Sequence, residues 1–291
     1  MIEQGWCPVE DGKVILRKVN SVGGESLGAR SSSCGSFPCS IPSRVSDCIV
    51  VIPTYNEREN IAALISALQS LSEPVDILVV DDNSPDETAG IVRNLIRQRE
   101  GIYLLSRPGK TGLGSAYKAG FAFALRHGWK YIAQMDADFS HDPKDVLRLL
   151  QACRQGADVA IGSRYVKGGR IEGWPLKRWV ISRGANLLAQ VMLRSRIRDL
   201  TGGFKCFTRQ ALEQIDLNRV ASEGYIFQVE MNHRARSQGL TIRQVPICFT
   251  DRKYGTSKMG TQEARDGIRQ LWRMMQRNQK KVAQQTQVEY A

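Results

Sequence analysis

Apolar residues recur along the middle of the chain with two alternating spacings, which predict the main secondary structure. Short, continuous apolar runs bounded by turn residues predict five buried strands, at residues 48–53, 76–82, 102–107, 131–136 and 158–165. Apolar residues three or four positions apart predict the intervening helices, at residues 57–71, 86–100, 114–127 and 143–154. Such alternation predicts an α/β fold with a mostly parallel central sheet and helices on both faces.

The spacing changes after residue 165. A basic segment containing tryptophan leads into a predicted helix near residues 178–193, and residues 199–209 are predicted to form a short edge strand. Residues 224–239 again have helical spacing, and residues 241–251 are predicted to form a strand.

Composition divides the chain into three parts. Residues 1–46 are rich in Ser and Gly and are predicted to be a flexible N-terminal tail. Residues 47–258 are predicted to be the folded domain, and residues 259–291 a basic amphipathic helix and tail. The chain has no run of 18 uncharged apolar residues and no apolar signal sequence at its start, so we expect no membrane span and a cytoplasmic setting.

Acidic residues follow three of the predicted strands. They are Glu57 and Glu59 after the first strand, Asp81, Asp82 and Asp86 after the second, and Asp136 and Asp138 after the fourth. Because parallel strands end at the same edge of a sheet, we expect these loops to lie together, where α/β proteins bind ligands. Asp86 alone has the position of an ordinary helix cap.

Asp136 and Asp138 are separated by one residue, so in extended backbone their side chains point the same way. Two hard oxygen ligands suit Mg²⁺ or Mn²⁺, whose other ligands are water and phosphate. The alternative is that Asp138 caps a turn while Asp136 pairs with an arginine. We favour the metal, which would in turn hold a diphosphate.

The segment RPGKTGLGSA at residues 107–116 is rich in glycine but fits neither common phosphate-binding motif. A P-loop requires glycine where Leu104 stands, and the dinucleotide-binding fingerprint requires glycine where Tyr117 stands. Lys110 in this loop can nevertheless approach a phosphate or a sugar.

The net charge of +12 favours an anionic partner such as phosphate, nucleic acid or a membrane surface. Nine Lys or Arg residues lie within residues 162–198 and nine more within residues 252–281, which predicts a basic binding surface. The seven cysteines have irregular spacing, which favours free thiols over a disulfide framework or a structural zinc site.

Eight stretches together resemble one family, the dolichol- or polyprenol-phosphate mannosyltransferases, which are inverting enzymes with the Rossmann-like GT-A fold. The stretches are VVIPTYNERENI, VVDDNSPD, QMDADFSHDP, GSRYVKGG, LKRWVISRGAN, DLTGGFK, GYIFQVEM and DRKYGTSK. The resemblance spans residues 47–258. It implies transfer of mannose from GDP-mannose to polyprenyl phosphate.

The resemblance also implies a role for particular residues. The residues implied to bind the donor are Pro53, Tyr55, Glu57, Val80, Asp82, Asp136, Ala137, Asp138, Arg252 and Lys258, to which we add Lys110. The residues implied to bind the acceptor phosphate are Arg164, Arg178 and Ser182. Asp136 and Asp138 would hold the metal, and the residues expected to act in catalysis are Asp138, Arg164 and Arg252. The family often has Gln where Ser140 stands, which puts the outer coordination of the metal in doubt.

The expected chemistry needs positive charge rather than a general base. A phosphate monoester has a second pKa of about 6, so the acceptor is already an anionic nucleophile at neutral pH. Arginine binds phosphate oxygens with two parallel hydrogen bonds, and the metal would stabilise the departing GDP. The chain has three histidines; we expect His141 to have a core or capping role, although it is close enough in sequence to contact the metal.

A lipid acceptor requires contact with a membrane. Within residues 263–281, apolar residues form one helical stripe and arginines recur every fourth position beside it. This pattern predicts either a helix lying in an anionic membrane interface or one packed on the core with its arginines outside. A membrane-embedded partner subunit is a second means of anchoring at the cytoplasmic face.

Three alternatives stay open at this stage. The first is the same reaction with another donor, such as UDP-glucose, because motifs do not distinguish sugars that differ at one hydroxyl. The second is a nucleic-acid-binding protein, but the basic segments lack interleaved aromatic residues. The third is a silent nucleotide-sugar binder, which the intact Asp136, Asp138 and Arg252 argue against.

Overall fold

The structure is a computed structural model that describes residues 4–9, 12–17 and 44–251. The described strands are β1 (Gln4–Val9), β2 (Gly12–Arg17), β3 (Cys48–Thr54), β4 (Asp76–Asp81), β5 (Ile102–Ser106), β6 (Tyr131–Gln134), β7 (Val159–Ser163), β8 (Arg170–Glu172), β9 (Lys205–Thr208), β10 (Ile242–Pro246) and β11 (Cys248–Thr250). The described α-helices are α1 (Arg58–Gln69), α2 (Thr88–Gln98), α3 (Leu113–His127), α4 (Asp145–Arg154), α5 (Leu176–Met192), α6 (Arg209–Ile215) and α7 (Gly224–Ser237).

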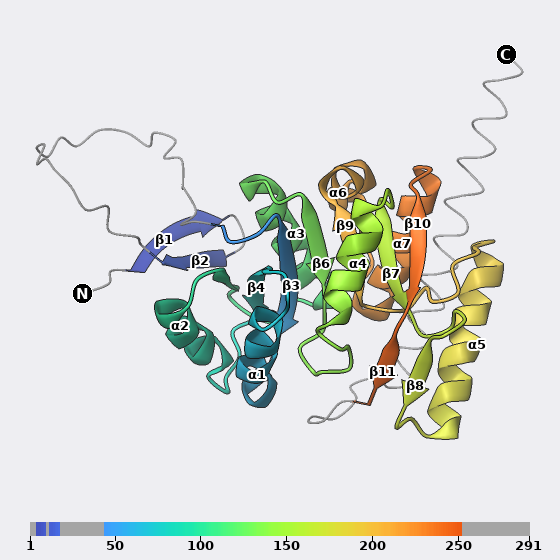
Figure 1. Cartoon of the computed structure of the whole chain (residues 1–291), viewed down its shortest axis with the longest axis horizontal. Coiled ribbons are helices and arrows are strands. Elements are labelled where there is room, and N and C mark those ends of the chain that lie inside the picture. Colours follow the sequence, from blue (N-terminus) through green and yellow to red (C-terminus); the bar gives the residue numbers. More distant parts are fainter. Residues whose placement is uncertain (1–3, 10–11, 18–43, 252–291) are drawn as a thin grey trace, which may run out of the picture.

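Among the described residues, nine strands form one sheet in the order β1-β2-β5-β4-β3-β6-β9-β7-β10. The strands β5, β4, β3 and β6 are parallel, as are β7 and β10, while β9 runs antiparallel between β6 and β7. A small second sheet pairs β8 with β11 (Figure 1). The predicted α/β fold with a mostly parallel sheet is confirmed.

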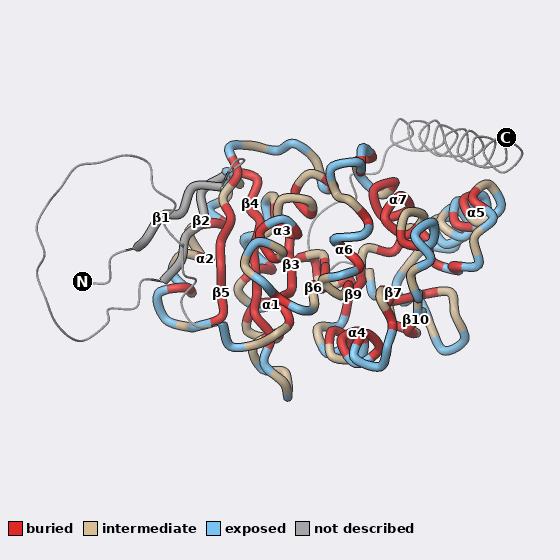
Figure 2. Tube along the Cα trace, turned by 90° about the horizontal axis from the view of Figure 1, so that it is seen from above, coloured by how far each residue is buried: buried red, intermediate tan, exposed pale blue. Residues whose placement is uncertain are grey.

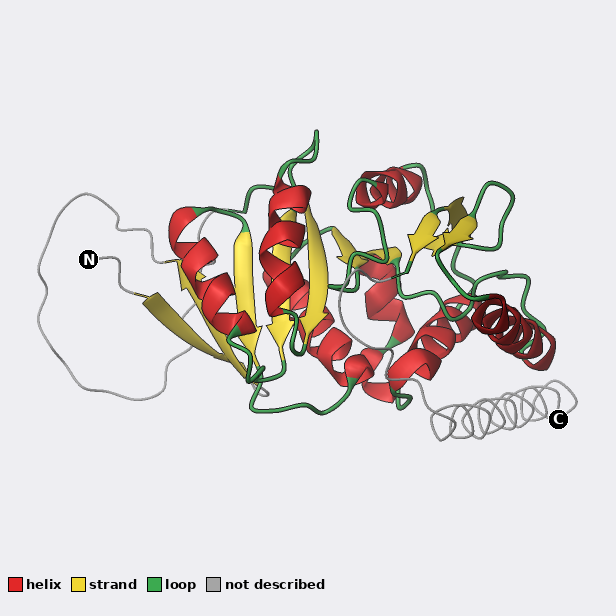
Figure 3. Ribbon diagram, turned by 90° about the horizontal axis from the view of Figure 1, so that it is seen from below, coloured by secondary structure: helices red, strands yellow, loops and turns green. Residues whose placement is uncertain are grey.

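Helices cover both faces of the large sheet, because successive strand residues point to opposite sides (Figure 3). In β3, Ile49 and Val51 pack in one core cluster with residues of α3, α6 and α7. Their neighbours Val50 and Ile52 pack in the other cluster, with residues of α1, α2 and α4. Both faces are therefore buried, which explains the continuous apolar strands in the sequence.

Two sequence predictions about secondary structure are wrong. Residues 199–209 were predicted to form an edge strand, but β9 lies inside the sheet between two other strands. Residues 1–46 were predicted to be a flexible tail, but β1 and β2 form an antiparallel hairpin that extends the sheet beyond β5. In the sequence, the dipeptide Asp11-Gly12 stands between two apolar runs, which is a hairpin signal that the tail prediction overlooked.

Two residues of helix α5 are buried in the domain, Asn186 and Ala189. Asn186 is fully buried; its amide donates to the Thr201 hydroxyl (2.9 Å), and its oxygen accepts from the Leu200 amide (2.9 Å). Much of the rest of α5 is exposed, as Figure 2 shows by its pale blue colour. The helix therefore projects from the domain beside β8 rather than covering the large sheet.

Candidate active site

The acidic loops that follow β3, β4 and β6 meet at one edge of the sheet, as predicted. The Asp82 amide donates to the Thr54 carbonyl (3.1 Å), and the Met135 amide donates to the Val51 carbonyl (3.1 Å). Pro53 and Val80 are paired in register on β3 and β4. These contacts hold the carboxyl ends of three parallel strands side by side, where α/β folds bind their ligands.

A basic loop lies next to the acids at this edge. The ammonium group of Lys110 stands 4.5 Å from the ring centre of Tyr55, in a cation–π contact. Arg107 lies 3.2 Å from the Asp82 carboxylate and donates to the Ser115 hydroxyl (2.8 Å). Lys110, Tyr55 and Asp82 were all predicted to bind the donor, and contacts of this loop connect the three.

Asp82 is nearly buried, with 5% of its surface exposed. Burial raises the pKa of Asp82, and the neighbouring Arg107 charge offsets only part of that increase. A carboxyl group with a raised pKa, at an edge lined by other acids, is more typical of a functional site than of a surface ion pair.

Several of the other acids have structural roles. Asp81 accepts hydrogen bonds from the hydroxyls of Thr54 (2.9 Å) and Ser84 (2.6 Å), which fixes the turn after β4. Asp86 accepts from the backbone amides of Arg58 (3.0 Å) and Thr88 (3.0 Å), the first residues of α1 and α2, although Glu87 and not Asp86 stands at the N-cap position of α2.

Glu57 precedes α1 at the same edge. Its carboxylate accepts a hydrogen bond from the side chain of Asn60 (2.9 Å), and its backbone amide donates to the Thr88 hydroxyl (3.0 Å). The loops after β3 and β4 are thereby joined to each other, which fixes Glu57 beside the predicted donor site.

Asp136 lies where four elements meet. Its Oδ1 accepts a hydrogen bond from the buried Tyr117 hydroxyl (2.9 Å), and its Oδ2 lies 3.7 Å from His141 Nε2. A Cβ atom added to Gly203 would lie 3.1 Å from the Asp136 carboxylate, so a larger residue there would press against that carboxylate. Burial and the Asp136 charge together raise the pKa of Tyr117, which stays a neutral hydrogen-bond donor.

Asp138 and Ala137 are both almost buried, at 8% and 4% exposure. Asp138 Oδ1 accepts from the Ser140 amide (3.1 Å), which is the turn-capping contact named as the alternative to metal binding. One carboxylate oxygen can cap a turn while the other binds a cation, so the two interpretations are compatible.

The residues around Asp136 fit a hard divalent cation. The described residues contain no group of three or more His, Cys, Asp or Glu side chains placed to hold a metal ion. Two carboxylates are nonetheless a sufficient protein contribution for Mg²⁺ or Mn²⁺, whose other ligands can be water and phosphate. Both ring nitrogens of buried His141 also lack a hydrogen-bond partner among the described residues, which leaves a nitrogen close to Asp136.

The glycine-rich loop before α3 meets a carboxylate rather than an open space. Glu223 accepts hydrogen bonds from the backbone amides of Gly114 (3.0 Å) and Ser115 (3.3 Å) at the first turn of α3. A Cβ atom on Gly112 would lie 2.4 Å from the Glu223 carboxylate. The helix end that a phosphate would use in a P-loop is therefore already occupied, in agreement with the failed motif.

Arg164, which was predicted to bind the acceptor phosphate, is buried and makes a bidentate ion pair with Asp199. The two distances are 2.8 Å and 2.7 Å, and the guanidinium also donates to the Thr201 hydroxyl (3.0 Å). Burial lowers the pKa of Arg164, but the facing carboxylate outweighs it and the net pKa is raised. Burial likewise raises the pKa of Asp199, yet Arg164 brings the net value below its usual range.

A second buried cation, Lys205, lies in the same neighbourhood. Its ammonium group donates to the Gly202 carbonyl (2.8 Å) and to the side-chain oxygen of Gln228. Burial lowers the pKa of Lys205 to about 7, although the charges of Asp199 and Asp136 act in the opposite direction. Lys205 therefore links the acceptor side of the site electrostatically to the metal side.

Arg178 and Ser182 lie on α5, as the acceptor prediction requires. The Arg178 guanidinium makes an ion pair with Asp251 (2.8 Å) and stands 4.2 Å from the ring centre of Trp174. The Ser182 hydroxyl is 2.9 Å from that of Tyr165, the residue after Arg164. The residues predicted to bind the acceptor thus come from the loop after β7 and from α5, and aromatic side chains lie between them.

Two predicted site residues, Arg252 and Lys258, lie outside the described residues, as does the predicted interfacial helix at 263–281. The structure adds Asp199, Lys205, Trp174 and Phe249, which sequence reasoning did not assign to the site. Asp199 and Lys205 belong to the stretch DLTGGFKCFTR, which was predicted to form a strand and contributed to the family resemblance, but neither residue was given a role in the site. A buried Asp–Lys pair flanking two glycines was the available signal.

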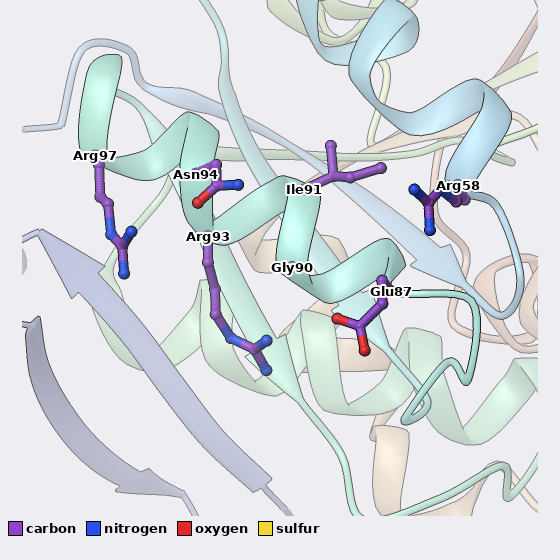
Figure 4. Close-up of a pocket in the computed structure, with 7 residues that line it drawn as sticks. All are labelled: Arg58, Glu87, Gly90, Ile91, Arg93, Asn94 and Arg97. Atoms are coloured by element: carbon purple, nitrogen blue, oxygen red, sulfur yellow. The ribbon is translucent and has the colours of Figure 1, made fainter.

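A shallow hollow of about 360 Å³ runs along α2 next to the first residue of α1. Figure 4 shows the residues that line it, which are Arg58, Glu87, Gly90, Ile91, Arg93, Asn94 and Arg97. None of the predicted site residues is among them. Within the described part of the chain, no helix is both long enough and apolar enough to span a membrane.

Comparison with known proteins identifies the class. Residues 49–216 match the profile described as glycosyl transferase family 2. The chain is 42% identical over 243 residues to a polyprenol monophosphomannose synthase of Mycolicibacterium smegmatis, covering 83% of this chain and 91% of the relative. It is 41% identical over 211 residues to an undecaprenyl-phosphate mannosyltransferase of Micrococcus luteus, covering 72% and 86%. The chain belongs to glycosyl transferase family 2 and is a glycosyltransferase.

Solved structures agree on the fold. A glucosyl-3-phosphoglycerate synthase of Mycobacterium tuberculosis, in complex with Mn²⁺ and UDP, matches with a TM-score of 0.55 at 18% identity, covering 77% of this chain and 76% of that one. A mannosyltransferase of Pyrobaculum calidifontis, in complex with GDP-Man and Mn²⁺, matches with a TM-score of 0.51 at 17% identity, covering 76% and 60%. At these identities the likeness supports the GT-A-like architecture alone.

Proposed function

We propose that this glycosyltransferase transfers mannose, with inversion, from GDP-mannose to a polyprenyl phosphate. The observation that carries the proposal is the identity of above 40% to two transferases whose names specify mannose and a polyprenyl phosphate, over most of both chains. The arrangement of charges is consistent with it. Carboxylates gather at the ends of β3, β4 and β6, while Arg164 directly follows β7 and Arg178 lies on α5.

On the donor side, the roles of the residues follow from their chemistry. Asp136 and Asp138 would hold Mg²⁺ or Mn²⁺, which when bound stabilises negative charge on the diphosphate. Tyr117 keeps one oxygen of Asp136 occupied by donating to it, which orients the carboxylate. Lys110 and Tyr55, in contact across 4.5 Å, lie next to Asp82 where the nucleotide would bind.

On the acceptor side, the phosphate itself is the nucleophile. Because it is already ionised at neutral pH, the chain needs groups that bind and orient the phosphate rather than one that removes a proton. Arg178 and Ser182 on α5 would receive it. Arg164 is held by Asp199 in one fixed orientation and contributes a buried positive charge beside the site.

We further propose that α5 meets the membrane that carries the acceptor. Of the nine strongly exposed large apolar side chains among the described residues, seven lie on α5; these are Leu176, Trp179, Val180, Ile181, Leu187, Leu188 and Val191. The helix has basic but no acidic residues. An exposed apolar helix with a purely basic charge fits an anionic lipid surface, and it carries Arg178 and Ser182 to that surface.

The test is transfer of labelled mannose from GDP-mannose into organic-extractable polyprenyl phosphate, with Mg²⁺ or Mn²⁺ and with a chelator. We expect metal-dependent transfer that falls at least about a hundredfold in Asp138→Ala, in line with the loss of one strong electrostatic contact to the transition state. Asp142→Ala is the matched control, because Asp142 is exposed and caps only a local turn. Transfer from UDP-glucose instead of GDP-mannose would contradict the proposed donor.

A further inference from the structure

Three aromatic rings form a continuous row between the two sides of the candidate site. His141 meets Phe249 edge-on with ring centres 5.2 Å apart, and Phe249 meets Trp174 edge-on at 5.3 Å. At one end of the row, His141 Nε2 lies 3.7 Å from the Asp136 carboxylate. At the other end, the guanidinium of Arg178 stands 4.2 Å from the Trp174 ring centre.

The first half of the row is fixed by the backbone. β11, which carries Phe249, lies against the loop that follows Asp138. The Thr250 amide donates to the Ser140 carbonyl (3.2 Å), and the Thr250 hydroxyl donates to the Phe139 carbonyl (3.2 Å). His141 also stacks on Phe204, a fully buried core residue, with ring centres 4.8 Å apart. His141 and Phe249 are therefore held in place relative to the carboxylates of the metal side.

The second half of the row places two arginines. The Trp174 ring lies 4.2 Å from the Arg178 guanidinium and 5.7 Å from that of Arg164. Each arginine is also fixed by a carboxylate, Asp251 and Asp199 respectively, at 2.8 Å and 2.7 Å. A guanidinium held between a ring and a carboxylate has lost most of its freedom to rotate, so its position depends on where the ring stands.

Packing alone does not account for Trp174. Its indole nitrogen is buried without a hydrogen-bond partner among the described residues, which a tryptophan serving only as core would normally avoid. The ring is instead in contact with two cations on the acceptor side and with the row that leads to the metal side. Such a position suits a spacer between two charged groups.

We propose that Trp174 is a positioning residue for the acceptor phosphate, and that the row His141–Phe249–Trp174 sets the spacing between the acceptor arginines and the Asp136 carboxylate. This inference rests on the proposed function, because it assumes a phosphate acceptor at Arg178. The spacing matters because an attacking phosphate oxygen must reach the sugar carbon within about 3–3.5 Å, and an error of about 1 Å costs roughly a hundredfold in rate.

The experiment measures binding without transfer. Farnesyl phosphate is titrated calorimetrically into the full chain with no nucleotide sugar present, using wild type, Trp174→Leu and Trp174→Phe. Trp174→Leu removes the ring, whereas Trp174→Phe keeps an aromatic face beneath the arginines. We expect Trp174→Leu to raise the Kd about tenfold and Trp174→Phe to stay within about threefold of wild type, as the strength of a cation–π contact implies.

A matched control is available at the other end of the parallel strands, where β6 begins. Tyr131 carries the Arg154 guanidinium at 5.7 Å from its ring centre, so Tyr131→Leu removes an arginine–aromatic contact far from the site. It should bind farnesyl phosphate as wild type does. Thermal unfolding of every variant checks that Trp174→Leu is folded, and Trp174→Phe, as the milder change, provides the comparison if it is not.

Steady-state transfer then separates positioning from general damage. We expect Trp174→Leu to raise the KM for polyprenyl phosphate while the KM for GDP-mannose stays unchanged. Equal increases in both constants, wild-type binding by Trp174→Leu, or no binding of farnesyl phosphate by the wild type would each overturn the inference. Wild-type binding of farnesyl phosphate without mannose transfer would instead refute the proposed function, and the comparison of Kd values would still decide the role of Trp174.

Discussion

The donor end and the acceptor end of the site are built in opposite ways. At the donor end, Asp82, Arg107 and Asp138 are each less than a tenth exposed, and the flanking helices bury their apolar faces against the sheet. At the acceptor end, α5 exposes most of its apolar side chains and buries only Asn186 and Ala189. One end is part of the core, and the other projects from it.

The difference indicates what each end has to bind. A nucleotide sugar is small and polar, so the donor end can be a rigid set of loops on parallel strands. A polyprenyl phosphate has a charged head on a long apolar tail that stays in a membrane. An acceptor end for such a molecule needs fixed cations next to an apolar surface that remains exposed in water. The Arg164–Asp199 pair provides the fixed cation, and α5 provides the exposed apolar surface.

Breaking the buried Arg164–Asp199 ion pair should have the largest effect of the changes proposed for the two ends of the site. Asp199→Asn leaves the guanidinium of Arg164, 8% exposed, without its charge partner. We expect the free energy of unfolding to fall by about 3–5 kcal/mol, measured by urea denaturation. Glu172→Gln is the control, since it disrupts an ion pair with Arg170 whose side chains are 67% and 53% exposed, and should change nothing measurable. Equal losses in the two variants would contradict a special role for burial.

Removing apolar surface from α5 should have an intermediate effect. Leu187 and Val191 lie one helical turn apart and are 59% and 68% exposed. Replacing both with serine should weaken binding to vesicles containing anionic lipid by at least about tenfold, because each buried apolar side chain contributes roughly 1.5–3 kcal/mol. Co-sedimentation with vesicles measures this. Val45→Ser, at an exposed position outside α5, should bind as wild type does, and a similar loss there would count against α5.

The smallest effect concerns a donor-end loop. Burial raises the pKa of Asp86, but hydrogen bonds from Thr88 and Arg58 outweigh it and bring the net pKa below the usual value. A lowered pKa in the folded state means that the stabilisation is present above about pH 4 and is lost as the pH falls through the folded-state value. Because Asp86 accepts from the first backbone amides of both α1 and α2, Asp86→Ala should cost about 1 kcal/mol at pH 7. Urea denaturation at pH 7 and at pH 3 measures this loss. The difference in the free energy of unfolding between wild type and Asp86→Ala should be smaller at pH 3, and an equal difference at the two pH values would refute the stabilising role of the ionised Asp86.

Much of the donor end could be predicted from the sequence. The periods of apolar residues located β3 to β7 and α1 to α4 to within a few residues, because both faces of a parallel sheet must be buried. The acidic loops met at one edge for the same topological reason. The antiparallel β9 could not be placed, since four residues between β6 and β7 have no periodic signal of their own.

The acceptor end was less predictable because its contacts join distant parts of the chain. Asp199 lies 35 residues after Arg164, and Asp251 lies 73 residues after Arg178. Neither pairing leaves a local pattern, so both arginines were predicted as phosphate ligands without their carboxylate partners. The predicted phosphate contacts of Arg164, Arg178 and Ser182 stay predictions, as do those of Arg252 and Lys258.

The most direct test of the account compares two acceptors that differ only in the phosphate. Initial rates of mannose transfer are measured with a polyprenyl phosphate and with the corresponding polyprenol, under the same metal and detergent conditions. If an anionic phosphate oxygen attacks the sugar, only the polyprenyl phosphate is mannosylated, and ³¹P NMR shows a phosphodiester product. Transfer to the polyprenol hydroxyl at a comparable rate would contradict the account, because a neutral hydroxyl needs the general base that this mechanism omits.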